Sequence, residues 1–290
     1  MSRIERRGQW PFDVRRLHPR FGAELVGIDL EGAPMPAAMA ALREAFVEFQ
    51  LILVRGQQVS VAAQAALARH FGEVLIEAAD PHRDAAHPEV SVLSNLDAAG
   101  NPTGRHPDKG TLEWHTDRSW DKRPAQATIV YAEQVTKDGG ETWYCDMYGA
   151  YDALDEAMQA RLAPLRAVHS RDFSRSRKHV ESPMTAAEKR AVSPVEHPIV
   201  RTHPESGRRC LFLGDHAEYV RDMDYADGRA LIEEVNALAI RPELILKHRL
   251  RPRDLIAWDN RCLLHRVTPY DAGRERRLVR RSTVIGEAPA

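Results

Sequence analysis

Apolar residues along this chain recur with two different periods, and each period predicts its own kind of element. Met39, Leu42, Phe46 and Phe49 follow the spacing of one helical face, which predicts an amphipathic helix over residues 37–50. Cap residues and similar spacing predict further helices from Ser60 to near Gly72, at about 148–162, and from Gly228 to Ile240.

Short runs of alternating or continuous apolar residues predict the strands. Leu51 to Val54 is typical of a buried strand, and Ala23 to Leu30 alternates apolar residues with polar or small ones. The other predicted strands are 90–96, 126–135, 194–202, 209–214, 244–250, 254–258 and 277–285. Many strands with few helices favour one β-rich domain over residues 1–290, with helices packed outside a β core.

Three segments lack both periods. Residues 77–88 and 97–113 have loop composition, and 170–193 carries many charges together with Ser, Met and Pro. The last segment is typical of a flexible excursion or lid rather than a linker between domains, and we expect all three to wall a pocket. Their histidines are candidates for contact with the substrate, but solvated surface residues are the interpretation we favour: His82, His87, His106 and His179.

Composition disfavours several classes of protein. The formal net charge is −1, so no overall attraction to nucleic acid or to an anionic membrane is expected. Cys145, Cys210 and Cys262 form no Cys-x-x-Cys pair, so neither a zinc ribbon nor a disulfide framework is predicted. No secretory signal and no run of about 18 apolar residues is present, so a cytoplasmic protein with reduced thiols and no membrane span is expected.

His115-Thr116-Asp117 is the first group with metal-binding chemistry. On an extended segment residues i and i+2 point to the same face, so His115 and Asp117 can reach one cation, although a surface polar pair is the alternative. His265 follows a predicted strand and a polar turn, and its alternative is a core histidine bonded to a backbone carbonyl. Two imidazoles and one carboxylate on one face of a metal are the ligand set of non-haem Fe(II) oxygenases, which is the interpretation we favour.

Five arginines cluster near the C-terminus: Arg274, Arg276, Arg277, Arg280 and Arg281. Alternation along the predicted strand places Arg277 and Arg281 on one face, ~13 Å apart at about 3.3 Å per residue. One guanidinium suits the far carboxylate of a cosubstrate, and the other suits a second anion. A nucleic-acid patch is the alternative, which the near-neutral charge disfavours.

A threonine follows the turn predicted at Gly139-Gly140. Its hydroxyl, on Thr142, is a candidate for assisting the binding of the cosubstrate carboxylate. The alternative is an ordinary hairpin, for which Gly-Gly is a common turn.

These residues together resemble the family of taurine dioxygenase and 2,4-dichlorophenoxyacetate dioxygenase, and the resemblance extends in order over nearly the whole chain. Its motifs are Gly22 to Leu30, Arg55-Gly56-Gln57, His70-Phe71-Gly72, Trp114-His115-Thr116-Asp117, Gly139-Gly140-Glu141-Thr142, Trp258-Asp259-Asn260-Arg261 and Arg276 to Thr283. Segments such as Cys145-Asp146-Met147 and Val200-Arg201-Thr202-His203 are more similar to the phenoxyacetate dioxygenase branch.

The resemblance implies a fold, cosubstrates and residue roles. The fold is a β-rich α+β structure with a distorted double-stranded β-helix (jelly-roll, cupin-like) core and flanking helices. The cosubstrates are 2-oxoglutarate and O2, and a dimer or tetramer is implied. The implied Fe(II) ligands are His115, Asp117 and His265; the implied ligands of the distal 2-oxoglutarate carboxylate are Thr142 and Arg277; the implied ligand of the prime substrate's anionic group is Arg281.

The implied activity is hydroxylation of a small anionic organic substrate, with release of succinate and CO2. An aryloxyalkanoate would be cleaved to a phenol and a 2-oxo acid. Taurine is not expected, because the histidine and asparagine of taurine dioxygenase have no counterpart in residues 71–77 or 111–114. An alkyl sulfate or sulfonate substrate is one alternative. A metal-binding jelly-roll protein without oxygenase activity is another, which the joint presence of Thr142, Arg277 and Arg281 disfavours, because a simple metal store needs no such anchors.

Overall fold

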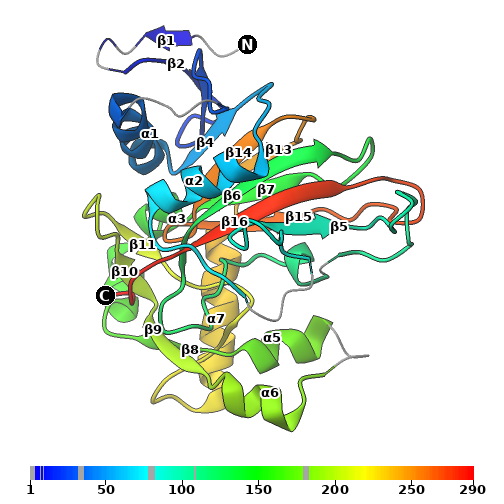
Figure 1. The fold of residues 1–290 in the computed structure, drawn as a ribbon. Helices are drawn as coiled ribbons and strands as arrows, with labels where there is room; N and C mark the ends of the chain where they lie inside the picture. Colours follow the sequence, from blue (N-terminus) through cyan, green and yellow to red (C-terminus); the bar gives the residue numbers. More distant parts are fainter. Residues whose placement is uncertain are drawn as a thin grey trace.

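The largest sheet of the protein has eight strands in the order β1-β2-β3-β4-β14-β6-β16-β5 (Figure 1). The computed structural model describes residues 4–6, 8, 10–31, 36–77, 82–107, 109–178 and 183–290. The strands of this sheet are β1 (Ile4–Arg6), β2 (Asp13–Arg16), β3 (Ala23–Val26), β4 (Leu51–Val54), β14 (Leu255–Asp259), β6 (Ala125–Gln134), β16 (Leu278–Ile285) and β5 (Ser91–Ser94). All neighbours are antiparallel except β3 and β4. The centre of the sheet, from β4 to β16, consists of strands that the apolar pattern predicted.

A second sheet packs on one face of the first. Its order is β13 (Ile245–His248), β7 (Thr142–Asp146) and β15 (Leu263–Val267). Both sheets contribute to one hydrophobic core, in which Trp258 of β14 lies beside Tyr144 of β7 with their ring centroids 5.5 Å apart. Two smaller sheets adjoin this pair: β12 (Ala217–Val220), β8 (Arg166–His169) and β9 (Val195–Pro198); and β10 (Val200–Thr202) with β11 (Arg209–Leu211).

The opposite face of the large sheet is covered by α1 (Pro36–Phe49) and α2 (Val61–Phe71). Leu255 and Ala257 of β14 point to these helices, whereas Ile256 and Trp258 point to the second sheet, as the period of a strand requires. The predicted apolar face of α1 is buried, and the Ser60 side chain accepts a hydrogen bond from the Ala63 N–H at the start of α2. Both helix predictions are therefore confirmed.

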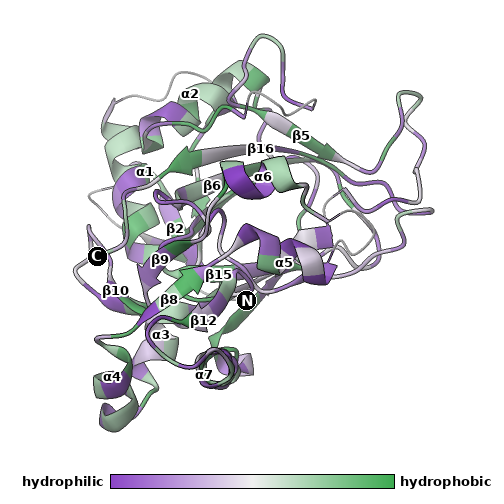
Figure 2. Ribbon diagram, turned by 90° about the horizontal axis from the view of Figure 1, so that it is seen from below, coloured by the Kyte–Doolittle hydropathy of each residue, from purple (hydrophilic) through white to green (hydrophobic). Residues whose placement is uncertain are grey.

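The remaining helices are α3 (Met147–Asp152), α4 (Glu156–Leu162), α5 (Arg171–Lys178), α6 (Ala186–Ala191), α7 (Tyr225–Ala239) and the short 3-10 turns η1 (Lys109–Leu112) and η2 (Pro242–Leu244). The predicted helix from Gly228 is part of α7, which buries Leu231 and Val235. Figure 2 shows the largely hydrophilic character of α5, in contrast to the apolar strands above it.

Four sequence predictions need correction. The single helix predicted at 148–162 is wrong, because the Asp155 carboxylate accepts a hydrogen bond from the Met158 N–H and begins a new helix, α4. The described part of 170–193 contains α5 and α6, which were not predicted; residues 179–182 of that segment, like 78–81 of the predicted loop 77–88, lie outside the described residues. The strand predicted at 194–202 is divided at Ile199 between two sheets, and β8 and β12 were missed.

Two findings bear on the other expectations from composition. Within the described ranges, no helix combines the length and apolar character that crossing a membrane would require. Cys145, Cys210 and Cys262 are buried free thiols, so the core contains no disulfide among them.

Candidate metal centre and its two cavities

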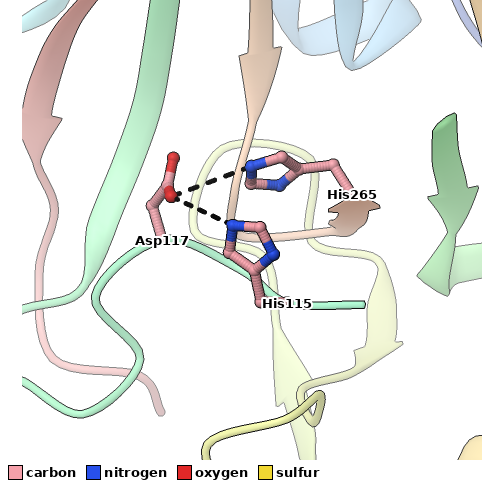
Figure 3. A group of neighbouring side chains, drawn as sticks. All are labelled: His115, Asp117 and His265. Atoms are coloured by element: carbon pink, nitrogen blue, oxygen red, sulfur yellow. Dashed lines mark ion pairs between the residues drawn. The ribbon is translucent and has the colours of Figure 1, made fainter. Parts of the chain in front are cut away.

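Three side chains from two distant parts of the chain converge at one point between the sheets (Figure 3). The Asp117 Oδ1 atom lies 3.6 Å from His115 Nε2 and 3.7 Å from His265 Nε2. The two imidazole centroids are 4.1 Å apart. The structure thus brings together His115, Asp117 and His265, which are separated by up to 150 residues in the sequence (265 − 115).

Backbone pairing positions the two histidines. His265 lies in β15, and His115 forms an isolated bridge with it, in which each N–H donates to the other carbonyl at 3.0 and 2.8 Å. His115 Nδ1–H donates to the Glu113 carbonyl at 2.8 Å, which leaves Nε2 with a lone pair for a ligand. His265 is held instead by packing, with Trp258 at 4.7 Å between ring centroids.

Asp117 is oriented by a chain of hydrogen bonds that ends at Asn260. The Asn260 Oδ1 atom accepts from the Asp117 N–H at 3.2 Å and from Trp258 Nε1 at 3.1 Å. Its Nδ2 group therefore faces Thr128 and donates to that hydroxyl at 2.9 Å. Because Thr128 accepts this bond, its single hydrogen is directed to Asp117 Oδ2, at 2.5 Å. Oδ1 is left facing the two histidines.

Burial and the neighbouring charges together set the protonation states of His265 and Asp117 that a metal site needs. Desolvation lowers the pKa of His265 to about 3, so its imidazole is neutral at pH 7. Burial alone would raise the pKa of Asp117, but the neighbouring His265, His115 and Arg281 outweigh it and hold that pKa well below its usual range. A neutral imidazole and an ionised carboxylate are the forms that bind a divalent metal.

An inner cavity of about 50 Å³ borders the three residues and extends between the two sheets. Thr142 and Arg277 line it together with Tyr144 and Trp258. Arg277 is 8% exposed and has no carboxylate partner among the described residues. Desolvation lowers its pKa, yet a guanidinium stays charged in proteins, so the inner cavity contains a buried cation available to an anion.

An outer cavity of about 340 Å³ adjoins His115 and Asp117. It shares these two residues, Thr111 and Arg281 with the inner cavity and is otherwise lined mostly by loop residues and α5. The predicted alternation is confirmed: Arg277, Val279 and Arg281 all face the inner cavity, whereas Arg280 pairs with Glu133 at 3.0 Å on the other side of the strand. The arginine cluster therefore points largely into the protein, and Arg277 and Arg280 are buried.

Sequence reasoning missed several residues of the site. Asn260 and Trp258 belong to a motif that was noted only for its resemblance, and nothing in the local pattern distinguished Thr128 or Tyr144. The interpretation of His106 as a surface residue is wrong, because it lines the inner cavity and packs on Tyr270 at 5.0 Å between ring centroids. His82 is exposed and His87 is partly buried, and His179 lies outside the described residues.

A second group of potential ligands, His203, Asp259 and Cys262, is a structural cluster. Arg261 donates to both carboxylate oxygens of Asp259 at 2.8 and 2.6 Å, and His203 Nε2 contacts the same carboxylate at 3.0 Å. The lone pairs that a metal would use are therefore occupied by this buried ion pair.

Comparisons with known proteins agree with this geometry. The model of the family "Taurine catabolism dioxygenase TauD, TfdA family" matches residues 13–283. The chain is 35% identical to the alpha-ketoglutarate-dependent 2,4-dichlorophenoxyacetate dioxygenase of Cupriavidus pinatubonensis, over 94% of this chain and 97% of that protein. It is 28% identical to an alpha-ketoglutarate-dependent sulfate ester dioxygenase of Pseudomonas putida, over 96% and 90% of the two chains. The crystal structure of AAD-2 in complex with Mn(II) and N-oxalylglycine superimposes with a TM-score of 0.83 and 31% identity, over 96% of this chain and 98% of that one.

Proposed function

The chain belongs to the TauD, TfdA family of dioxygenases, and on this basis we propose that it is an Fe(II)- and 2-oxoglutarate-dependent enzyme that hydroxylates a small anionic organic substrate. One observation carries the proposal: two histidines and one carboxylate converge at the inner cavity, which Arg277 also lines, and Arg281 borders both this cavity and the outer one. The proposed products are the hydroxylated substrate, succinate and CO2.

His115, Asp117 and His265 are the proposed Fe(II) ligands. Their nitrogen and oxygen donors fit a ferrous ion, since they converge within 4.8 Å of one another and include the ionised Asp117 carboxylate and the neutral His265 imidazole. Fe(II) held there would activate O2 for oxidation of a C–H bond, coupled to the decarboxylation of 2-oxoglutarate. Thr128 and Asn260 keep the Asp117 carboxylate turned to the metal.

Thr142 and Arg277 are the proposed anchors of 2-oxoglutarate. Both line the inner cavity, where a distal carboxylate would pair with the buried Arg277 and accept a bond from the Thr142 hydroxyl. The enclosing apolar residues Val130, Ile256 and Val279 exclude water from this pair, which strengthens it.

Arg281 is the proposed anchor of the prime substrate, because it borders the outer cavity next to Asp117. It would hold the substrate carboxylate so that the neighbouring carbon faces the metal centre, and such positioning supplies much of the rate. With an aryloxyalkanoate, hydroxylation beside the ether oxygen gives a hemiacetal, which collapses to a phenol and a 2-oxo acid. The 35% identity to a dichlorophenoxyacetate dioxygenase supports this substrate class.

We also propose the architecture that accompanies this activity. The two packed sheets with β14, β15 and β7 around the site support a distorted double-stranded β-helix in a single domain over residues 1–290. The segment 170–193 is proposed to act as a lid, since Arg171, Ser174, Arg175 and Lys178 of α5 line the outer cavity. A dimer or tetramer stays a prediction.

Anaerobic titration tests the proposal. Fe(II) with 2-oxoglutarate should produce a weak visible charge-transfer band in the wild-type protein, and a correct substrate should shift it. Admission of O2 should then release succinate, and phenoxyacetates should stimulate this release more than alkyl sulfates. Preference for alkyl sulfates would favour the second candidate, a sulfate ester dioxygenase, which the 28% identity to such an enzyme supports. Absence of both band and succinate would leave only a metal-binding protein.

A further inference from the structure

The outer cavity contains more positive charge than one substrate carboxylate requires. Arg118, Arg171, Arg175, Lys178 and Arg281 line it, against the carboxylates of Glu77 and Asp117. We propose that the prime substrate carries two anionic groups, one bound by Arg281 at the metal centre and the other by Arg171 at the start of α5. This inference rests on the proposed function and narrows its substrate to a dianion.

Arg171 is a cation of the outer cavity whose charge is not neutralised by an ion pair with any described residue. It is partly buried at the first position of α5 and has no ion pair with a carboxylate among the described residues. Desolvation lowers its pKa, and the nearby charges of Arg175 and Arg118 act in the same direction. Because a guanidinium cannot shed its proton in this range, an anion at Arg171 would relieve both desolvation and repulsion.

The neighbouring carboxylates are already engaged. The charges of Glu77 and Glu188 act on Arg171. Glu77 accepts a hydrogen bond from Arg118 at 2.5 Å, and Arg118 also pairs with Asp121 at 2.7 Å. Glu188 accepts hydrogen bonds from Thr185 at 2.7 and 2.9 Å. Lys178 forms a buried ion pair with Asp215. Arg118 and Lys178 are thus paired with carboxylates, whereas Arg171 and Arg281 have no such ion pair among the described residues.

Trp120 holds the Arg171 guanidinium in place without neutralising it. The Arg171 Cζ atom lies 4.7 Å from the indole centroid, and the Arg118 Cζ atom lies 4.5 Å from it. Stacking on an aromatic face orients the planar group and leaves its N–H donors free for two parallel bonds to a carboxylate, sulfonate or phosphate oxygen pair. Arg171 is thus a pre-oriented anion site that shares a cavity with Arg281.

Two ligands that share the phenoxyacetate scaffold test the proposal: phenoxyacetate, a monoanion, and 4-carboxyphenoxyacetate, a dianion. Binding is measured by calorimetry on protein loaded with Mn(II) and saturated with N-oxalylglycine, in which an NH replaces one CH2 of 2-oxoglutarate. The wild-type protein should bind the dianion about tenfold more tightly, as one additional charge-assisted interaction provides. Arg171→Gln should remove that preference and leave the monoanion unaffected, and Arg171→Lys should retain part of it.

Arg177→Gln is the matched control, because it removes the same charge from α5 at a side chain that packs on Phe173 outside the outer cavity. Equal affinity of the wild-type protein for both ligands, no binding of the dianion, or equal losses in the Arg171 and Arg177 variants would overturn the proposal. Oxygen-dependent succinate formation is measured separately. If the protein prefers the dianion through Arg171 but forms no succinate, the proposed function is contradicted, whereas the proposed dianion site is still supported.

Discussion

The inner and outer cavities share two of the three candidate metal ligands, His115 and Asp117, but are built from different parts of the fold. The inner cavity is about 50 Å³, and most of its wall comes from strands β6, β7, β14, β15 and β16, with one buried arginine. The outer cavity is about 340 Å³, and most of its wall comes from loops and α5, with five cationic side chains. Strand walls are fixed by backbone pairing on both sides, whereas loops tolerate change. The contrast suggests that the inner cavity serves the constant cosubstrate and the outer cavity the variable substrate.

Removing a ligand that borders both cavities should give the largest effect. Asp117→Ala deletes the carboxylate that lies beside both imidazoles, so we expect iron content near background and loss of substrate-dependent succinate formation. Iron analysis and turnover check this, and Asp121→Ala, which removes a nearby carboxylate paired with Arg118, is the control. Wild-type iron content and turnover in Asp117→Ala would exclude its role as a ligand.

Replacing each of the two arginines in turn should distinguish the ligand bound in the inner cavity from the ligand bound in the outer one. Arg277→Gln should weaken 2-oxoglutarate binding about 100-fold, because one charge-assisted interaction contributes ~1.5–3 kcal/mol and this one is enclosed. Arg281→Ala should instead raise the KM of the prime substrate strongly and leave the affinity for 2-oxoglutarate nearly unchanged. Titration of the charge-transfer band and steady-state KM values measure the two effects. Equal losses for both ligands in either variant would contradict the division of the site.

The hydrogen bonds that orient Asp117 can be tested without replacing any of the three proposed metal ligands. Asn260→Asp replaces the Nδ2 donor with an oxygen, so Thr128 can donate to residue 260 instead of to Asp117. We expect the affinity for iron to fall by about tenfold, as it does when other residues that orient metal ligands are replaced. The interaction of Arg277 with the 2-oxoglutarate carboxylate should not change. Asn101→Asp, at an exposed loop position, is the control. Iron affinity equal to that of the wild type would show that Asp117 does not depend on this chain.

The same contrast explains what could be predicted from the sequence. The central strands and the shared face of Arg277 and Arg281 follow from a period of two, which any buried strand must keep. His115 and His265 could be proposed as partners from the chemistry of their side chains and from the resemblance, but no local pattern shows that a bridge pairs them across 150 positions (265 − 115). The segment 170–193 was expected to wall a pocket, and Arg171 in it does line the outer cavity. Its contact with Trp120 could not be predicted, because that contact depends on how α5 packs against the loop after Asp117. Likewise, the burial of His106 depends on its contact with Tyr270, which is far away in the sequence.

Thr142→Val should give the smallest effect, confined to the inner cavity. The substitution keeps the shape of the side chain and removes one hydroxyl donor to the 2-oxoglutarate carboxylate, a neutral group whose bond contributes ~0.5–1.5 kcal/mol. We therefore expect the affinity for 2-oxoglutarate to fall by about three- to tenfold, with the affinity for the prime substrate unchanged. Thr136→Val is the matched control, because that hydroxyl donates to the Gly139 carbonyl in the preceding turn and does not line either cavity. If both variants weaken 2-oxoglutarate binding alike, the effect comes from the hairpin that carries Thr142, and the alternative of an ordinary turn threonine is restored.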